Sequence, residues 1–377
     1  IGNTTGNTLT KATLTAGSGI SITNGPGSIT ITATGGGGGG TSPGGSDTQV
    51  QYNSSGSFAG SANFTFDGSS ITVSSVKIGT GAGGAGSSTA VGNSALPANT
   101  TGTYNSAFGF NALLLNTTGA SNTALGPDTL HSNTSGGSNV AVGRNALYFN
   151  TSGSANSAFG NGALYSNSGS GTTANSAFGA SALYSTTTGV GNAAFGYQSL
   201  YSNTSGVDNN AYGYCSLSNN TTGNYNQAHG NFAMQSNTTG SYNVAMGDSA
   251  LYRATNQTNN VALGHYSQYN NTGGSYNVAV GSSSLYGNSN GSNNVAVGHL
   301  SMYSNTSGSG NAGIGYQSLY SNTSGVNNNA HGYNALSSTT NGSYNVAFGN
   351  SALYRNQGGN YNIAIGDSAL YLSLIHI

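Results

Sequence analysis

The chain has 377 residues, of which only 3% are charged and 63 are glycine, and its formal net charge at pH 7 is −1. Globular domains usually carry about 25% charged residues. This composition excludes the basic surface that nucleic acid or an anionic membrane would need. Cys215 is the single cysteine, which excludes an intrachain disulfide framework and a cysteine metal cluster.

The first 87 residues differ from the rest of the chain. In residues 19–34, Ile alternates with Thr and Ser on both sides of a Gly-rich turn, so residues 1–34 are predicted to form a β-hairpin module. Residues 35–46 are Gly-rich and predict a flexible linker. Residues 47–87 predict a small β module that ends in a Gly-rich joint. Its strand-like runs lie at 48–52, 63–66 and 70–78.

Residues 88–371 repeat one short sequence motif, in which an apolar residue is followed by glycine. The spacing is 17 residues, except for the 19 residues between Gly160 and Gly179. Self-similarity at a fixed period indicates a repeat architecture. We call this glycine the marker glycine and number each repeat from it, as position 0. The seventeen marker glycines are Gly92, Gly109, Gly126, Gly143, Gly160, Gly179, Gly196, Gly213, Gly230, Gly247, Gly264, Gly281, Gly298, Gly315, Gly332, Gly349 and Gly366.

Three rows of small or apolar residues accompany the marker glycine. Position −1 is apolar in nearly every repeat, position −2 is Ala in sixteen of seventeen repeats, and position +4 is Leu in fourteen. In a strand, positions −3 and −1 point to one face and position −2 to the other. We therefore expect the −1 residues and the +4 leucines to fill the core, and the alanines to face a closely packed surface.

Polar positions recur as strictly as the apolar ones. Asn occupies position −4 in sixteen repeats, from Asn105 to Asn362, and stacked coils would align these amides into a hydrogen-bonded ladder. The turn reads Asn-Thr-Thr/Ser-Gly in most repeats, as at 150–153, which suits tight turns. Nine turn asparagines also lie in the Asn-x-Ser/Thr triplets that a eukaryotic secretory pathway glycosylates. We interpret them as turn residues.

Position +5 is Tyr in eleven repeats. Tyr rings stack on sugars and their hydroxyls bond to them, so this row is the candidate glycan contact surface. The alternative is a ladder of rings that only packs along the rod. The candidate contact residues are Tyr148, Tyr165, Tyr201, Tyr252, Tyr286, Tyr303, Tyr320 and Tyr354.

Together these rows predict an all-β fold, a β-solenoid or β-roll of seventeen 17-residue coils. Two short strands joined by two turns would form each coil. Coils stack about 4.8 Å apart, which gives a rod roughly 80 Å long. Two core residues per coil bury little surface, so we expect a parallel homotrimer packed through the alanine row, for example through Ala141, Ala158 and Ala245.

The segments NVAVGSSSLY (277–286), NNVAVGHLSMY (293–303) and NIAIGDSALY (362–371) resemble the head repeats of trimeric autotransporter adhesins of the YadA type. The motif is also similar to repeats in phage tail fibres, which segments 14–34 and 45–73 resemble as well. The resemblance to the adhesin head repeats covers residues 88–371. It implies a trimeric fibre, located outside the cell or on a virion, or on the cell surface if the chain is an adhesin. It also implies attachment to a host glycan or receptor, without nucleic acid or membrane insertion.

Residues that could carry chemistry are scattered. The six aspartates form no local pair within the repeats, and no nucleophile motif accompanies the many serines. We therefore expect no enzymatic activity, no cofactor and no metal. His229 and His331 occupy the −1 row, where a metal on a threefold axis could use them, but we interpret them as tolerated polar substitutions. Cys215 is interpreted in the same way.

Two functions follow from this sequence. The first is a structural fibre or adhesin segment that projects a host-binding or glycan-binding region. The alternative is an ice-binding β-solenoid, because Thr151, Thr204 and Thr238 would align at one turn position. The final residues 372–377 read LSLIHI, which breaks the repeat and resembles a translated sequencing adapter, so we exclude them from fold predictions.

Overall fold

The computed structural model describes residues 4–5, 8–9, 20–26, 28–33, 47–54, 57–83 and 87–372. All regular secondary structure among these residues is β. The chain divides into two compact units, residues 1–77 and 78–377. The linker predicted at 35–46 lies outside the described residues, as does the predicted artefact except for Leu372.

The first unit contains short antiparallel ladders. Strand β3 (Ile20–Gly25) pairs with β4 (Ser28–Ala33), with Ile22 opposite Ile31, which confirms the hairpin. The run predicted at 70–78 is two strands, because Ser74 has a positive φ of 56° and turns the chain. The remaining strands that begin in this unit are β1 (Thr4–Thr5), β2 (Thr8–Leu9), β5 (Gln49–Ser54), β6 (Ser57–Phe66), β7 (Ser70–Val73) and β8 (Val76–Gly79).

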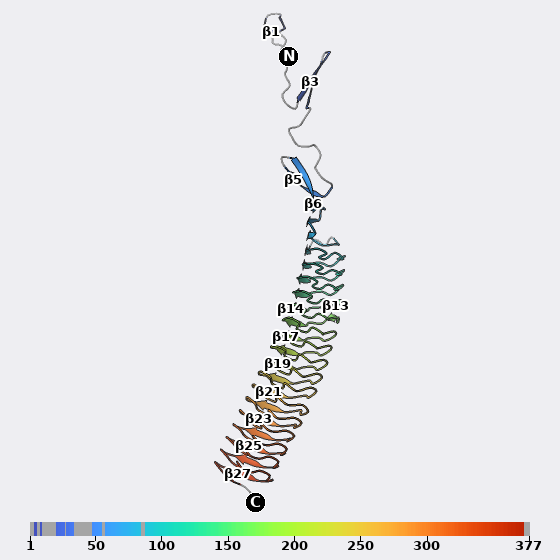
Figure 1. Cartoon of the computed structure of the whole chain (residues 1–377). Coiled ribbons are helices and arrows are strands. Elements are labelled where there is room, and N and C mark those ends of the chain that lie inside the picture. Colours follow the sequence, from blue (N-terminus) through green and yellow to red (C-terminus); the bar gives the residue numbers. More distant parts are fainter. Residues whose placement is uncertain are drawn as a thin grey trace. The chain divides into compact units, whose positions relative to one another are not determined.

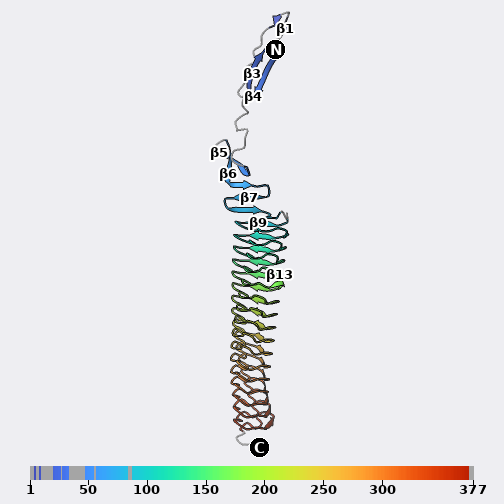
Figure 2. The same cartoon turned by 90° about the vertical axis from the view of Figure 1, so that its right-hand side faces the viewer.

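In the second unit, each repeat contributes one three-residue strand at positions −3 to −1, and consecutive strands pair in parallel (Figures 1 and 2). This confirms the predicted β-solenoid of 17-residue coils. Its strands are β9 (Thr89–Val91), β10 (Ser106–Phe108), β11 (Thr123–Leu125), β12 (Val140–Val142), β14 (Ser157–Phe159), β16 (Ser176–Phe178), β17 (Ala193–Phe195), β18 (Asn210–Tyr212), β19 (Gln227–His229), β20 (Val244–Met246), β21 (Val261–Leu263), β22 (Val278–Val280), β23 (Val295–Val297), β24 (Ala312–Ile314), β25 (Asn329–His331), β26 (Val346–Phe348) and β27 (Ile363–Ile365).

The 19-residue repeat keeps this main ladder unbroken. Its two extra residues extend the turn, where β13 (Ser152–Ser154) and β15 (Ser170–Thr172) add a small parallel pair. Strand β14 still pairs with β16 in register, Ala158 opposite Ala177. An insertion in the turn is therefore absorbed outside the core.

The second strand expected in each coil does not form. The residues at positions +2 and +4 have positive φ, 59° at Asn145 and 53° at Leu147, so the chain turns where an extended strand was predicted. Leucine in this left-handed region costs about 1–2 kcal/mol. Hydrogen bonds to neighbouring coils hold the conformation: Asn145 N donates to Pro127 O at 3.1 Å, and Leu147 N donates to Ala163 O at 3.0 Å.

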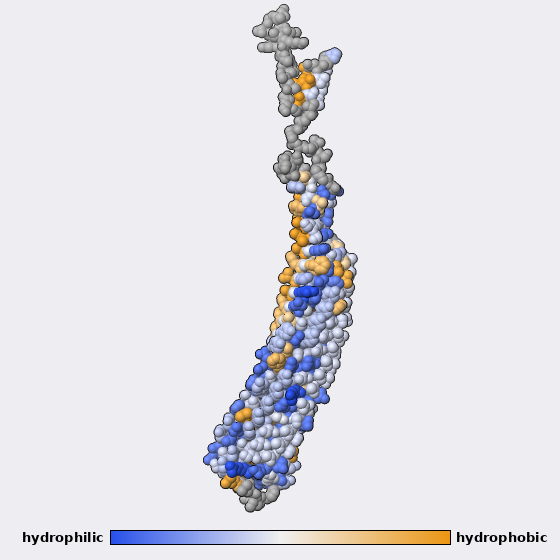
Figure 3. Space-filling view, in the orientation of Figure 1, coloured by the Kyte–Doolittle hydropathy of each residue, from blue (hydrophilic) through white to orange (hydrophobic). Residues whose placement is uncertain are grey.

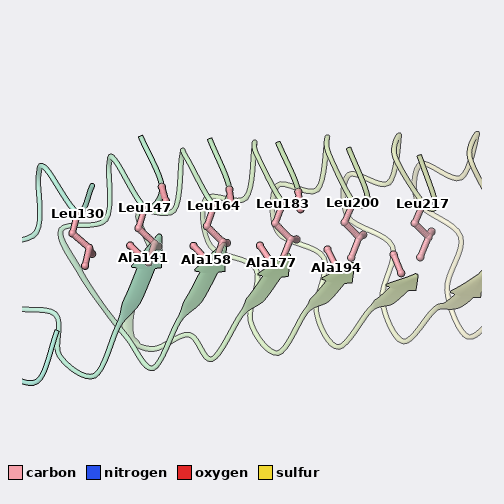
Figure 4. Close-up of a cluster of buried hydrophobic side chains, with 14 of the residues drawn as sticks. Leu130, Ala141, Leu147, Ala158, Leu164, Ala177, Leu183, Ala194, Leu200 and Leu217 are labelled. Carbon is pink, nitrogen blue, oxygen red and sulfur yellow. The ribbon is translucent and has the colours of Figure 1, made fainter. Parts of the chain in front are cut away.

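The alanine row, and not the −1 row, faces the inside of the coil. Ala141, Ala158 and their equivalents are fully buried and lie opposite the leucines at +4 (Figure 4). Phe108 and Phe348 at −1 are instead 39% and 38% exposed. The prediction for these two rows was wrong because the space opposite the leucine is narrow, so only a methyl group fits there. The alanines cannot form a surface between chains.

The asparagines at −4 form the predicted ladder, and they are buried. Asn122 Oδ1 accepts hydrogen bonds from the backbone N and from Nδ2 of Asn139, both at 3.1 Å. Asn139 Nδ2 also donates to Gly153 O at 2.9 Å. Each amide therefore ties two coils and one turn together.

The turn asparagines at +7 form a second buried ladder. Asn150 Nδ2 donates to Asn133 Oδ1 at 2.8 Å and to Gly153 O at 3.0 Å. Gly153 thus accepts from both ladders, and a Cβ at this position would lie 2.5 Å from Asn150 Oδ1, so only glycine fits. The asparagines of the Asn-x-Ser/Thr triplets are buried inside the fold, which supports our interpretation of them as turn residues.

Three repeats break the second ladder. Thr186, Ala254 and Thr339 replace the asparagine, and in each case the preceding asparagine keeps a buried Oδ1 without a hydrogen-bond partner. The three orphaned acceptors belong to Asn167, Asn237 and Asn322. A buried polar group without a partner costs about 1–3 kcal/mol.

We predict that Thr339→Asn stabilises the protein by about 1 kcal/mol, the usual net contribution of a hydrogen bond. The new amide can donate to Asn322 Oδ1, and its own oxygen can accept from Asn356. The measurement is the free energy of unfolding from denaturant titration. Ser324→Asn, at an exposed turn position, is the matched control and should change little. A Thr339→Asn protein no more stable than this control would contradict the role of the ladder.

Candidate binding surfaces

The tyrosines at +5 form stacked columns, so the candidate glycan residues do come together along the coils. Tyr148 stacks on Tyr165 with ring centroids 5.4 Å apart, and Tyr184 continues the column to Tyr201. A second column contains Tyr252, Tyr269, Tyr286, Tyr303 and Tyr320. Tyr354 stacks on Tyr371.

This stacking limits how the +5 row could meet a sugar. Inside a column each ring face is covered by the ring of the next coil, whereas the end rings Tyr201, Tyr320 and Tyr354 stack on one side only. All eight candidate side chains are only partly exposed. A sugar ring that stacks on tyrosine needs a free ring face. Inside a column the rings therefore offer only their edges and hydroxyls. This is what the alternative of a ladder that only packs along the rod predicts.

Burial and proximity change the acidity of these phenols. Burial raises the pKa of Tyr184 above its usual 10.0, and the neighbouring Tyr165 and Tyr201 raise it further. Burial is also the first cause of the raised pKa of Tyr269 and of Tyr303. Tyr184, Tyr269 and Tyr303 therefore favour the neutral phenol over the phenolate.

A continuous uncharged face runs along the outside of the strands. Its residues are those at −3 and −1, and none of them in any repeat is Asp, Lys or Arg. Phe159, Phe178, Phe195 and Tyr212 stack with centroids 4.6–4.7 Å apart. The space-filling view shows hydrophobic residues on this strand side over the first repeats (Figure 3). We call this the strand face.

The two −1 histidines are part of the strand face. His229 is tilted against Tyr212 at 4.7 Å, whereas His331 stacks on Phe348 and its Nε2 lies 2.8 Å from Asn329 Oδ1. They lie in different coils. Among the described residues, no group of three or more His, Cys, Asp or Glu could hold a metal ion.

Other polar side chains on the surface pair weakly. His265 Nε2 lies 4.0 Å from Asp248 Oδ2, and both side chains are half exposed, a geometry that contributes little to stability.

Cys215 is buried, and burial raises the pKa of its thiol, which keeps it in the unreactive protonated form.

Two further sets of aromatic rings were not predicted: stacked pairs at +1, such as Tyr197 and Tyr214, and a column at position −5. The −5 column is the more exposed of the two. It contains the most exposed tyrosines of the repeats, among them Tyr276, which is 60% exposed, and Tyr361, which is 73% exposed. The signal was present in the sequence, because Tyr recurs at −5 in Tyr104, Tyr225, Tyr242, Tyr276, Tyr344 and Tyr361.

No known protein family, curated protein or solved structure matches this chain. No helix within the described ranges has the length and apolarity that crossing a membrane requires.

Because the folded chain binds the phenol protons more tightly than the unfolded chain, we predict that stability falls as the pH rises above about 10. Below the unfolded pKa this contribution is complete, and it is lost as the native tyrosines ionise. The measurement is the urea midpoint between pH 8 and pH 11.5. The variant with Tyr184→Phe, Tyr269→Phe and Tyr303→Phe should show a shallower fall, and equal slopes for the two proteins would contradict the assignment.

Proposed function

We propose that the repeats form the shaft of a phage tail fibre or a bacterial surface fibre, which projects a host-binding or glycan-binding region. The observation that carries this proposal is the unbroken parallel ladder from β9 to β27, reinforced by two buried asparagine ladders. Because each coil contacts only its neighbours, such a stack can be lengthened by adding repeats. A low-charge rod with a repeating surface suits a role outside the cell or on a virion.

We further propose that the shaft is a homotrimer packed through the strand face, in place of the alanine row. Large apolar side chains are exposed there, including Met246 (44%) and Phe348 (38%). The face presents its rows at the spacing of one coil, so only a partner with the same repeat can match it over its whole length. A second and third copy of this chain meet that requirement.

The assembly test places a charge on the strand face. Met246→Asp combined with Phe348→Asp should weaken assembly, because an unpaired carboxylate is costly to bury between chains. The measurement is mass by light scattering. Ser324→Asp at an exposed turn, combined with Ser307→Asp, adds the same charge elsewhere and should leave the assembly intact. A folded, monomeric wild-type protein would refute the proposal.

One observation favours ice binding as a second candidate function. The threonines at +8 form a regular column, in which Thr134 Oγ1 donates to Thr151 O at 3.0 Å and Thr204 Oγ1 donates to Thr221 O at 3.0 Å. The adjacent position +9 varies among Thr, Ser, Asn and Gly, so a second matching row is missing. Thermal hysteresis of the purified chain should be present if it binds ice and absent if it is only a fibre shaft.

A further inference from the structure

The tyrosines of the −5 column share one backbone conformation. Their backbone φ values are 56° at Tyr225, 60° at Tyr242 and 61° at Tyr276, so the side chains leave the chain in the same way. Where two tyrosines occupy consecutive coils, their rings stack: Tyr225 and Tyr242 lie 5.1 Å apart with an interplanar angle of 12°. Tyr344 and Tyr361 stack in the same way, 5.0 Å apart at 9°. Rings that have a ring neighbour in this column therefore turn their faces toward it.

One ring is missing between Tyr242 and Tyr276. The intervening coil carries Asn259, which has the same backbone conformation with φ of 58°. Tyr242 is 57% exposed, Tyr276 is 60% exposed, and Asn259 is also exposed. Because asparagine is much shorter than tyrosine, it leaves room between the positions of the two rings. We call these three residues the Tyr–Asn–Tyr cluster.

The spacing of the cluster suits a puckered ring. Two coil steps separate the two tyrosines by about 9.6 Å. Carbon atoms make their best contacts at about 3.5–4.0 Å, so a ring that contacts both tyrosine faces must have some thickness of its own. A saturated six-membered sugar ring presents C–H groups on both faces and is thicker than a flat aromatic ring.

Asn259 supplies a free polar group between the two rings. Its backbone N donates to Ser241 O at 3.2 Å, but its side-chain amide makes no hydrogen bond to any described residue. The adjacent Asn260 differs, since its amide is buried and donates to Gly274 O at 3.1 Å. The Asn259 amide can therefore donate to one sugar hydroxyl and accept from another.

The residues next to the cluster along the chain are uncharged. The −3 residues of these coils are Val244, Val261 and Val278, and the +11 residues beside the column are Ser241, Thr258 and Ser275. The hydroxyl of Ser275 already accepts a hydrogen bond from Thr258 N at 3.1 Å. A ligand in contact with these residues meets no charged side chain among them, which suits a neutral molecule.

We propose that the Tyr–Asn–Tyr cluster binds the ring of a neutral pyranose sugar, held between Tyr242 and Tyr276 and hydrogen-bonded by Asn259. This places a saccharide contact on the side of the shaft at −5, outside the +5 row. It deepens the glycan-binding part of the proposed function, but it needs only one chain. Sugar binding by the cluster can be absent although the fibre assembles, and it can be present in a monomer.

The test is saturation-transfer NMR of the full chain with the methyl pyranosides of glucose, galactose and mannose, and with N-acetylglucosamine. At least one should bind. Tyr276→Ala should weaken binding by about tenfold or more, because one stacking face is lost. Asn259→Tyr should abolish binding without loss of fold, because it fills the gap with a ring in a column that already accepts Tyr.

The matched control is Tyr344→Ala, which removes an exposed ring from the same column where no second tyrosine faces it across a one-coil gap. This variant should bind as the wild type does. The proposal is overturned if none of the four sugars binds. It is also overturned if Asn259→Tyr still binds, if Tyr344→Ala loses binding equally, or if adenosine, a flat aromatic probe, binds in their place.

Discussion

The structure depends on how little apolar volume a coil with one short strand can enclose. Most coils bury one leucine between small residues, and a fully buried leucine contributes about 1.5–3 kcal/mol. That is modest beside the conformational entropy of 17 ordered residues. Buried hydrogen bonds between coils must therefore supply specificity, and the two asparagine ladders do so, with Gly153 O and its equivalents accepting from both.

The consequences of this constraint are clearest where the pattern fails. Gln268 stands in place of the core leucine, and its amide donates to Val261 O at 2.8 Å and to Asn277 O at 3.3 Å. Its Oε1 accepts from Asn271, whose usual partner in the preceding coil is lost because Ala254 occupies that position. The buried apolar residues divide into two clusters on either side of Gln268. A polar substitution survives here because every group it buries has a partner.

The sequence could predict the repeat, the coil stack, the leucine row and the −4 ladder, because each depends only on periodicity and residue type. It could not predict which face of the strand points into the core. Alternation separates Ala141 from Val142, but only the narrow space opposite Leu147 determines that the alanine lies inside. The left-handed conformation of Leu147 was equally hidden, since leucine avoids it and neighbouring coils impose it. The stacking of the +5 rings was hidden too, because only the coil geometry brings residues such as Tyr148 and Tyr165 face to face.

The claim that the 17-residue coil is the structural unit can be tested most directly by deletion. Removing residues 192–208 takes out one whole coil and keeps every row in register, so the protein should remain folded with a nearly unchanged melting temperature and a rod about 4.8 Å shorter. Removing residues 192–199 shifts turn residues into the positions of the core and the ladders. The melting temperature should therefore drop. An eight-residue deletion that melts at the wild-type temperature would contradict the account.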